Sequence, residues 1–406
     1  MVHQTEEGHS NVEKYNKILK RLDKFGKIVG LDILFRDENT PANFLLKFAI
    51  TDTTLYVALI IYSTYLFYGD FLKSAFCWTT FGLAFDSVMK FYVFIFYRRD
   101  LYKVMQDMRE LFQRHEHDAE ASAKLGRMLI YASLASYATF FCFANTCLTL
   151  NSLALMETMR TGVKTLVFGF YLPWWDHMTN FGYAINMLYQ NLQMVLVVFH
   201  SSQGDGFYLC HMILACARLA ALGHQIDLLD RYLVAPNRET LSPREDEENI
   251  DRQLKDILDQ HLIHIQYMHR MEKLYSTYSF LLVTSCMLVV VINIFVLIST
   301  LWLAGIFLGI ACLFKIMAFC VLGSVVSVQD EKIVEKLYNM RWYLMPKDKQ
   351  KAVLMLLRSA QNPVEPTMMK FKPLNLNTFL NCLNMIYSIS AMLFTMTGKH
   401  SESMKT

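Results

Sequence analysis

The run "SFLLVTSCMLVVVINIFVLISTLWLAGIFLGIACLFKIMAFCVLGSVVS", residues 279–327, contains a single charged residue, Lys315. A helix crosses the hydrocarbon of a bilayer with about 20 mostly apolar residues, so this run is too long for one crossing. We expect it to turn at "STLWLAG", residues 299–305, where Trp302 suits the interface between lipid and water. The run therefore predicts two consecutive transmembrane helices.

The rest of the chain has the same apolar character. Of its 406 residues 54% are hydrophobic and 18% charged, and the mean hydropathy is +0.25; a soluble chain carries about a quarter charged residues. Spans are predicted at 43–68, 72–97, 128–152, 181–202, 276–299, 303–327 and 374–396. All eight prolines lie outside these spans or at their edges, which supports the segmentation. We expect an all-α polytopic membrane protein with seven transmembrane helices, without a cleavable signal peptide or a disulfide framework.

The placement of Lys and Arg orients these helices. Of the 39 such residues, 31 lie in the alternate connections that begin with residues 1–42, and 5 lie in the others. Cytoplasmic connections carry the Lys and Arg excess. The N-terminus is therefore predicted to be cytoplasmic and the C-terminus extracellular.

Asp230-Arg231-Tyr232 matches the DRY tripeptide of rhodopsin-like G-protein-coupled receptors. Here it follows four predicted spans instead of three, no NPxxY motif ends the last span, and the predicted orientation is reversed. We interpret the tripeptide as the polar end of a cytoplasmic helix that stops before Pro236. A G-protein-coupled receptor remains a less favoured alternative, and a transporter ranks below it.

The C-terminal part of the chain carries a set of spaced motifs. Tyr338 and Trp342-Tyr343 precede Arg358 and Pro363, and a "PLNLNTF" stretch at 373–379 leads into a last span with Tyr387-Ser388. This pattern resembles the insect odorant receptor family. Stretches 170–177, 205–233 and 258–280 are also similar to that family, so the resemblance covers most of the chain. The Thr-Tyr…Gln-Phe signature of the related gustatory receptors is missing, which ranks a gustatory receptor channel second.

The resemblance implies a ligand-gated, non-selective cation channel of four subunits in the plasma membrane of olfactory sensory neurons. Because the long insertion of the common co-receptor is absent, the chain looks like a ligand-tuning subunit that assembles with that co-receptor. The resemblance also implies that the last span lines a pore, and we carry over Ile389, Ser390, Leu393 and Phe394 as pore residues. No enzyme motif, cofactor, metal site or nucleic-acid partner is expected.

A binding site for a small neutral odorant is expected where the outer halves of the spans leave an apolar cavity. Candidate lining residues are Trp78, Phe81, Phe85, Phe140, Phe143, Cys147, Tyr183, Met187, Gln190 and Met194. Gln190 or Tyr183 could make one hydrogen bond to the ligand. Stripes of this kind are also typical of ordinary helix packing.

The predicted organisation has four parts. These are a cytoplasmic segment 1–42, spans one to six at 43–327 with cytoplasmic helical extensions at 205–275, cytoplasmic anchor helices at 328–372, and the pore-lining last span with a short extracellular tail at 373–406. The anchor carries an apolar stripe, for which we name Ile333, Leu337, Met340 and Trp342 as the subunit anchor. Packing within one subunit would also satisfy such a stripe.

Several charged residues need a separate account. Asp86 and Lys90 are four residues apart and are expected to neutralise each other on one helix face. Lys315 is expected to reach toward the inner interface. The acidic run 244–249 is expected to be a flexible linker. His261 and His264 share a helical face, but no Cys or carboxylate set completes a metal site.

Overall fold

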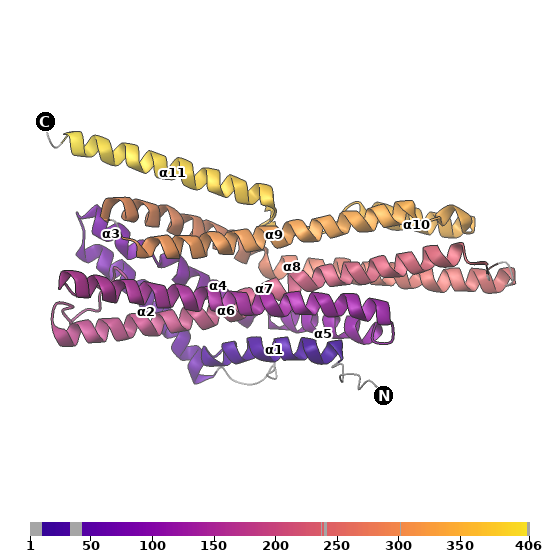
Figure 1. Ribbon diagram of the computed structural model, residues 1–406, viewed down its shortest axis with the longest axis horizontal. Coiled ribbons are helices and arrows are strands. Elements are labelled where there is room, and N and C mark those ends of the chain that lie inside the picture. The colour runs from indigo at the N-terminus through magenta and orange to yellow at the C-terminus, as the bar shows by residue number, and fades with distance from the viewer. Residues whose placement is uncertain (1–9, 33–42, 237, 239–241, 301, 404–406) are drawn as a thin grey trace, which may run out of the picture.

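The computed structural model describes residues 10–32, 43–236, 238, 242–300 and 302–403, which are almost entirely helical. Long helices lie side by side along one axis (Figure 1). Seven segments are long and apolar enough to cross a membrane, as the sequence predicts. They are α2 (Phe44–Leu66), α3 (Phe71–Trp78) with α4 (Phe81–Phe96), α6 (Ala119–Thr161), α7 (Asn180–Leu233), α8 (Pro243–Thr300), α9 (Ala304–Asn339) and α11 (Leu376–Ser403).

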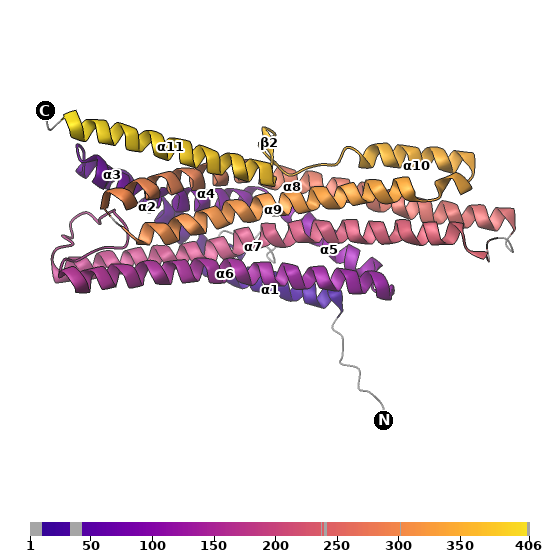
Figure 2. The ribbon, with the colours of Figure 1, turned by 45° about the horizontal axis from the view of Figure 1, so that its top comes forward.

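Shorter elements complete the described chain. They are α1 (Asn11–Ile28), α5 (Arg98–Arg114), the 3-10 helix η3 (Trp342–Leu344), α10 (Lys347–Ala360) and the strands β1 (Thr367–Met368) and β2 (Lys372–Pro373). The two strands pair antiparallel, with Thr367 opposite Pro373, in a hairpin near the start of α11 (Figure 2). Met369 and Lys370 adopt positive φ angles of 50° and 61° at its tip.

Helix α7 is the central helix of the bundle. Its middle section, from His200 to Met212, is buried on every side, and it packs against α1, α6, α8 and α9. Gly204 and Gly206 let neighbouring side chains approach this section closely, and the buried carboxylate of Asp205 in it is paired with Lys90 and Lys315. Apolar residues further along α7, among them Leu219, Leu222 and Leu229, are also buried inside this chain.

The prediction of a flexible linker at 244–249 is wrong. Helix α8 begins at Pro243 and runs without a break to Thr300, and the acidic run forms its first turns. Proline is favoured at the first helical position, and carboxylates are stabilising near a helix N-terminus. Ser242 caps the end, because its hydroxyl bonds to the Glu245 carboxylate and accepts the Glu245 backbone N–H. These local interactions extend the helix through a stretch whose composition resembles a linker.

The Asp230-Arg231-Tyr232 tripeptide joins α7 to two other helices of the same chain. Asp230 accepts the backbone N–H of Arg341 at 2.9 Å and the Arg341 Nε at 3.0 Å, just beyond the end of α9. Tyr232 donates its hydroxyl to Asp246 of α8 at 3.0 Å. The tripeptide therefore forms intramolecular contacts at the polar end of a helix.

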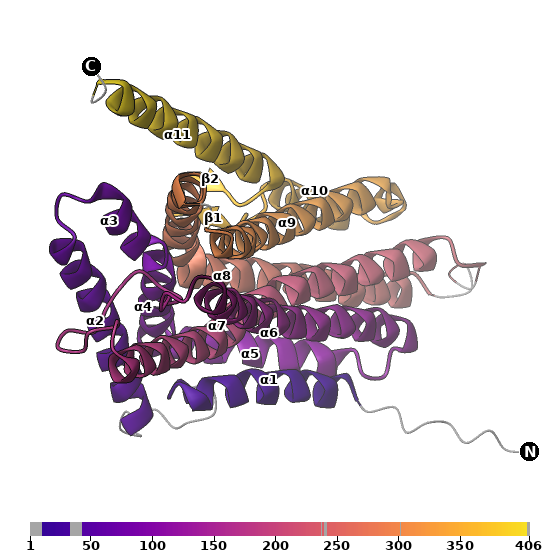
Figure 3. The same ribbon diagram turned by 60° about the vertical axis from the view of Figure 1, so that its left-hand side comes forward.

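Helix α11 leaves the bundle and contacts it mainly near its own start (Figures 1 and 3). The Leu376 N–H donates to the Ser324 hydroxyl of α9 at 2.9 Å. A Cβ placed on Gly323 would lie 1.9 Å from the Leu374 carbonyl oxygen, so only glycine permits this approach. Beyond this point α11 presents large exposed apolar side chains, among them Leu380, Met385 and Met392.

Candidate ligand cavity

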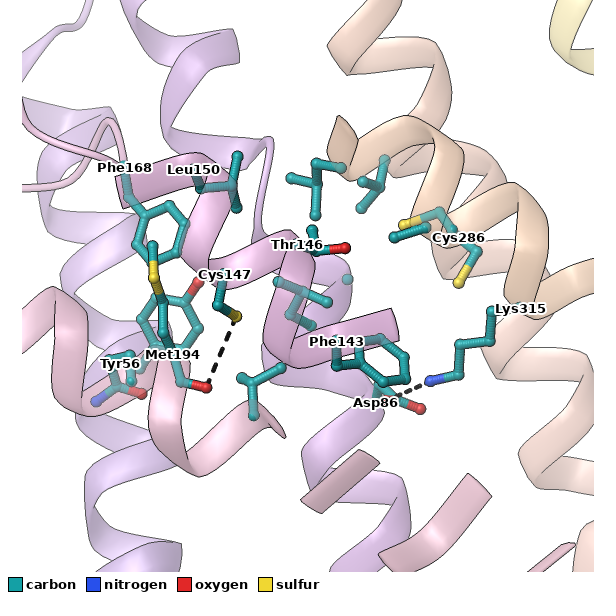
Figure 4. Close-up of a pocket in the computed structure, with 18 residues that line it drawn as sticks. Tyr56, Asp86, Phe143, Thr146, Cys147, Leu150, Phe168, Met194, Cys286 and Lys315 are labelled. Atoms are coloured by element: carbon teal, nitrogen blue, oxygen red, sulfur yellow. Dashed lines mark hydrogen bonds and ion pairs between the residues drawn. The ribbon is translucent and has the colours of Figure 1, made fainter. Parts of the chain in front are cut away.

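A mainly apolar cavity lies between α2, α4, α6, α7, α8 and α9 (Figure 4). It contains about 670 Å³ of space that protein atoms do not fill, a volume that includes space open to solvent. Its lining residues are Tyr56, Gly82, Leu83, Asp86, Phe143, Thr146, Cys147, Leu150, Phe168, Gln193, Met194, Val197, Cys286, Val289, Leu308, Ala311, Cys312 and Lys315. Most of these side chains are apolar, so the cavity suits a small, mainly hydrocarbon molecule held by dispersion and burial.

The connection between α6 and α7, residues 162–179, closes one end of the cavity through Phe168. Gln190 of α7 holds this segment: its amide oxygen accepts the Phe168 N–H at 3.0 Å, and its NH2 donates to the carbonyl oxygens of Phe168 at 3.2 Å and Phe170 at 3.0 Å. The Tyr171 N–H also donates to the Ser63 hydroxyl at 3.0 Å. These bonds satisfy the backbone of a buried irregular segment, which would otherwise be costly.

Asp86 and Lys315 line the opposite end of the cavity and belong to a buried cluster of four charged side chains, Asp86, Lys90, Asp205 and Lys315, which we call the charge cluster. Lys315 of α9 lies 2.7 Å from Asp86 of α4 and 3.0 Å from Asp205 of α7. Lys90 lies 2.6 Å from Asp86 and 3.3 Å from Asp205. Tyr278 of α8 donates its hydroxyl to both carboxylates. Four helices therefore meet at two carboxylates and two ammonium groups, whose formal charges cancel.

The expectation that Lys315 reaches the inner interface is wrong. Its side chain is 7% exposed and points into the bundle, where two carboxylates compensate its charge. An unpaired charge at this depth is costly, and pairing with hydrogen bonding removes most of that cost. Gly204 of α7 makes room for the cluster, because a Cβ there would lie 2.8 Å from the Lys90 side chain.

The residues predicted from sequence to line a cavity take three kinds of position. Phe143, Cys147 and Met194 line it, and Gln190 holds the segment that closes it. Others pack beside the cavity: Trp78 contacts Phe81, Phe81 stacks on Phe85, Met187 packs in the adjacent apolar cluster, and Tyr183 donates to the Thr165 carbonyl oxygen.

Phe140 lies elsewhere, because its ring stacks on Phe25 of α1 with centroids 5.1 Å apart. Tyr56, Phe168, Asp86 and Lys315 also line the cavity and were not among the predicted lining residues. Asp86 and Lys315 are ionisable residues inside predicted spans, and this property is the sequence signal that could have identified them.

The predicted pore and anchor residues also have defined places. On α11, Ile389 is exposed, Ser390 is buried, and Leu393 and Phe394 are half-buried. In the anchor, Ile333, Leu337 and Met340 are buried within this chain, and Trp342 is half-buried. Tyr338, Tyr343 and Met355 are the exposed large side chains beside them.

His261 and His264 lie in a small recess on α8, outside the predicted spans. His261 Nε2 lies 3.2 Å from the Ser359 hydroxyl, and His264 Nε2 lies 3.6 Å from Asp330. Burial lowers the pKa of His261 to about 4 and also lowers that of His264. In the part of the chain that the structure describes, no three His, Cys, Asp or Glu side chains gather in a way that could hold a metal ion.

Seven apolar helices of spanning length define a multi-pass membrane protein. The chain belongs to the family described as "7tm Odorant receptor", whose model matches residues 69–387. It is 19% identical over 402 residues to a candidate odorant receptor, 83c, of Drosophila melanogaster, covering 94% of this chain and 97% of that one.

Its fold is similar to that of the insect olfactory receptor OR5 from Machilis hrabei. The TM-score is 0.74 for the complex of OR5 with eugenol, at 15% identity, and 0.76 for a second OR5 structure, at 16% identity. In both comparisons the match covers 94% of this chain and 99% of the OR5 chain.

Proposed function

We propose that this chain is the ligand-tuning subunit of an odorant-gated channel. It binds a small neutral odorant in the cavity and opens a non-selective cation pore in a tetramer with the odorant receptor co-receptor. The observation that carries this proposal is the mainly apolar cavity in a chain that belongs to the odorant receptor family. That OR5 is described in complex with eugenol supports small-molecule binding by this fold.

Orientation and location are part of the same proposal. The N-terminus is cytoplasmic and the C-terminus extracellular, in the plasma membrane of olfactory sensory neurons. The asymmetry of Lys and Arg supports this orientation, because it puts the excess on the side of the α7–α8 connection and α10. In that orientation the cavity lies in the outer part of the bundle.

Assembly and the pore involve exposed surfaces on α11 and in the anchor. Helix α11 lines the pore with Ile389, Ser390, Leu393 and Phe394, and its exposed apolar side chains contact sibling subunits or lipid. In the anchor, the buried stripe of Ile333, Leu337 and Met340 fixes α9 within the chain. The exposed Tyr338, Tyr343 and Met355 then face neighbouring subunits.

The experiment is co-expression with the co-receptor, followed by recording of ligand-evoked current in excised patches without GTP, over a broad odorant panel. We expect current that depends on this chain and needs no GTP. A requirement for GTP, or no current over the whole panel while the co-receptor responds to its own agonist, would contradict the proposal. An epitope tag at residue 1, detected only after permeabilisation, checks the orientation.

Two substitutions on α6 separate ligand binding from general effects on the helix. Phe143 lines the cavity, whereas Phe141, two residues away, is 63% exposed on the outside of the bundle. Burial of a phenylalanine side chain contributes about 1.5–3 kcal/mol, so Phe143→Ala should raise the agonist EC50 at least about tenfold. Phe141→Ala should leave it unchanged. Equal effects of the two would place the ligand elsewhere.

A further inference from the structure

The polar side chains on the cavity wall differ in whether they have a hydrogen-bond donor to spare. Tyr56 donates its hydroxyl to the Thr80 carbonyl oxygen at 3.4 Å, and Thr146 donates to the Cys142 carbonyl oxygen at 2.8 Å. Gln193 donates to Asp52 at 2.7 Å. These three groups are engaged with the protein. A ligand therefore gains least from competing with them.

Lys315 is different, because an ammonium group has three N–H donors. Two of these N–H donors point to Asp86 and Asp205, which are the carboxylates paired with Lys315 among the described residues. The Nζ atom also lies 5.6 Å from the centroid of the Phe143 ring, at the cavity end of the charge cluster (Figure 4). One donor of Lys315 is thus directed to the cavity and its aromatic wall.

The acceptors of the cluster are in use, and so are the donors of the other lysine. Asp86 receives Lys90 and Lys315 on Oδ2 and Tyr278 on Oδ1. Lys90 donates to Asp86 at 2.6 Å, Ser201 at 3.0 Å and Asp205 at 3.4 Å, and it does not line the cavity. The charge cluster therefore offers the cavity a donor from Lys315, while both carboxylates already accept from ammonium and hydroxyl groups.

We propose that Lys315 is the specificity-determining residue of the cavity and selects neutral ligands that carry a hydrogen-bond-accepting oxygen, such as ketones, aldehydes and esters. The oxygen points to Lys315, and the hydrocarbon part lies toward Phe143, Met194 and Phe168. This inference rests on the proposed function, because it takes the cavity as the odorant site.

The balance of charge in the cluster explains why the ligand is neutral. Two carboxylates and two ammonium groups already compensate one another. A carboxylic acid or an amine in its ionised form would add a charge without a partner in an apolar environment, which is strongly unfavourable. A carbonyl oxygen adds a hydrogen bond and no charge.

The test compares odorants that differ only in the oxygen. In 2-methyl-1-heptene a CH2 group replaces the carbonyl oxygen of 2-heptanone, and α-methylstyrene relates to acetophenone in the same way. With the co-receptor present, we expect each ketone to have an EC50 at least about tenfold lower than its alkene, since hydrogen bonds to charged groups are among the stronger ones. Equal potencies within each pair would overturn the inference and leave the proposed function standing. Absence of current over the broad panel would overturn both.

Two double variants that keep the cluster neutral locate the donor. Lys315→Met with Asp205→Asn removes the donor on the cavity, whereas Lys90→Met with Asp205→Asn removes an equal pair of charges and leaves Lys315 in place. The first should abolish the difference between ketone and alkene while the alkene still acts, and the second should preserve the difference. The reverse pattern, or loss of the difference in both, would overturn the inference.

A single variant covers the case in which the first double variant does not reach the cell surface. Lys315→Arg retains the charge but alters the reach and geometry of the donor. We then expect the order of potency of 2-heptanone and 4-heptanone to change relative to the unmodified chain. An unchanged order would count against recognition of the oxygen by residue 315.

Discussion

Replacing Gln190 with Leu should loosen the segment 162–179 over the cavity. Gln190 has no exposed surface, and its amide makes three hydrogen bonds to the backbone of Phe168 and Phe170. Leucine fills a similar volume and makes none of them. At about 1 kcal/mol net for each bond, closure of the segment loses about 3 kcal/mol, and its open population rises roughly 100-fold.

Hydrogen–deuterium exchange of the purified full-length chain measures this opening directly. The peptide that contains Phe168 should exchange much faster in Gln190→Leu, and because Phe168 lines the cavity, the agonist EC50 should rise as well. Asn191→Leu is the matched control, since the Asn191 side chain donates to the Met187 carbonyl oxygen within α7. Unchanged exchange in Gln190→Leu, or the same increase in Asn191→Leu, would refute this account of how the cavity is closed.

Three further results are expected. Gly323→Ala should displace the start of α11 and reduce evoked current, because a Cβ there meets the Leu374 carbonyl oxygen at 1.9 Å. In the control, Gly309→Ala on the same helix, the added Cβ meets nothing within 4 Å, so this variant should be neutral or slightly stabilising. Equal effects of the two variants on current would contradict the role of Gly323. The melting temperature of the purified chain should fall as pH drops from 6.5 toward 4. Burial lowers the pKa of His261 from its ordinary 6.5 to about 4, so in this pH range the unfolded state binds a proton at His261 and the folded state does not. His261→Gln should flatten that dependence, whereas a substitution of the exposed His117 should not. Asp230→Asn should cost no more than about 1 kcal/mol, since Asp230 and Arg341 are partly exposed, and should leave currents in patches without GTP intact; loss of current at normal surface levels would favour a G-protein switch.

The seven helices were predictable because lipid imposes one requirement on every span. Each must be apolar over about 20 residues and must satisfy its own backbone hydrogen bonds, and both properties are local. The length of α8 was not predictable from composition. Its acidic first turns resemble a linker, and their helical state depends on the cap at Ser242 and on the position of Pro243.

The cavity was predictable only in part, because its lining depends on which helices meet. Phe140, Phe143 and Cys147 share one helical face by spacing, yet Phe140 turns to Phe25 of α1. Helix α1 was expected only as part of a polar cytoplasmic segment, but Tyr15, Leu19 and Leu22 bury one of its faces. Likewise, Gln190 was identified as a hydrogen-bonding residue, but its partners are backbone groups of a segment 20 to 22 residues away in sequence. Asp86 and Lys90 were predicted as a local pair, and Lys315 was noticed alone. Asp205 was not noticed, because pairing over more than 100 residues leaves no local pattern.

Helix α8 is an uninterrupted rod of 58 residues, about 87 Å long, while the hydrocarbon layer is only about 30 Å thick. Cys286 on the cavity wall and Pro243 at the far end are separated by about 65 Å of this rod. A tilt of about 5° at the cavity therefore displaces the far end by about 6 Å, more than the rise of one helical turn. A small tilt of α8 that barely alters the contacts of a ligand can therefore move a side chain at the Pro243 end of the helix from one neighbouring residue to the next.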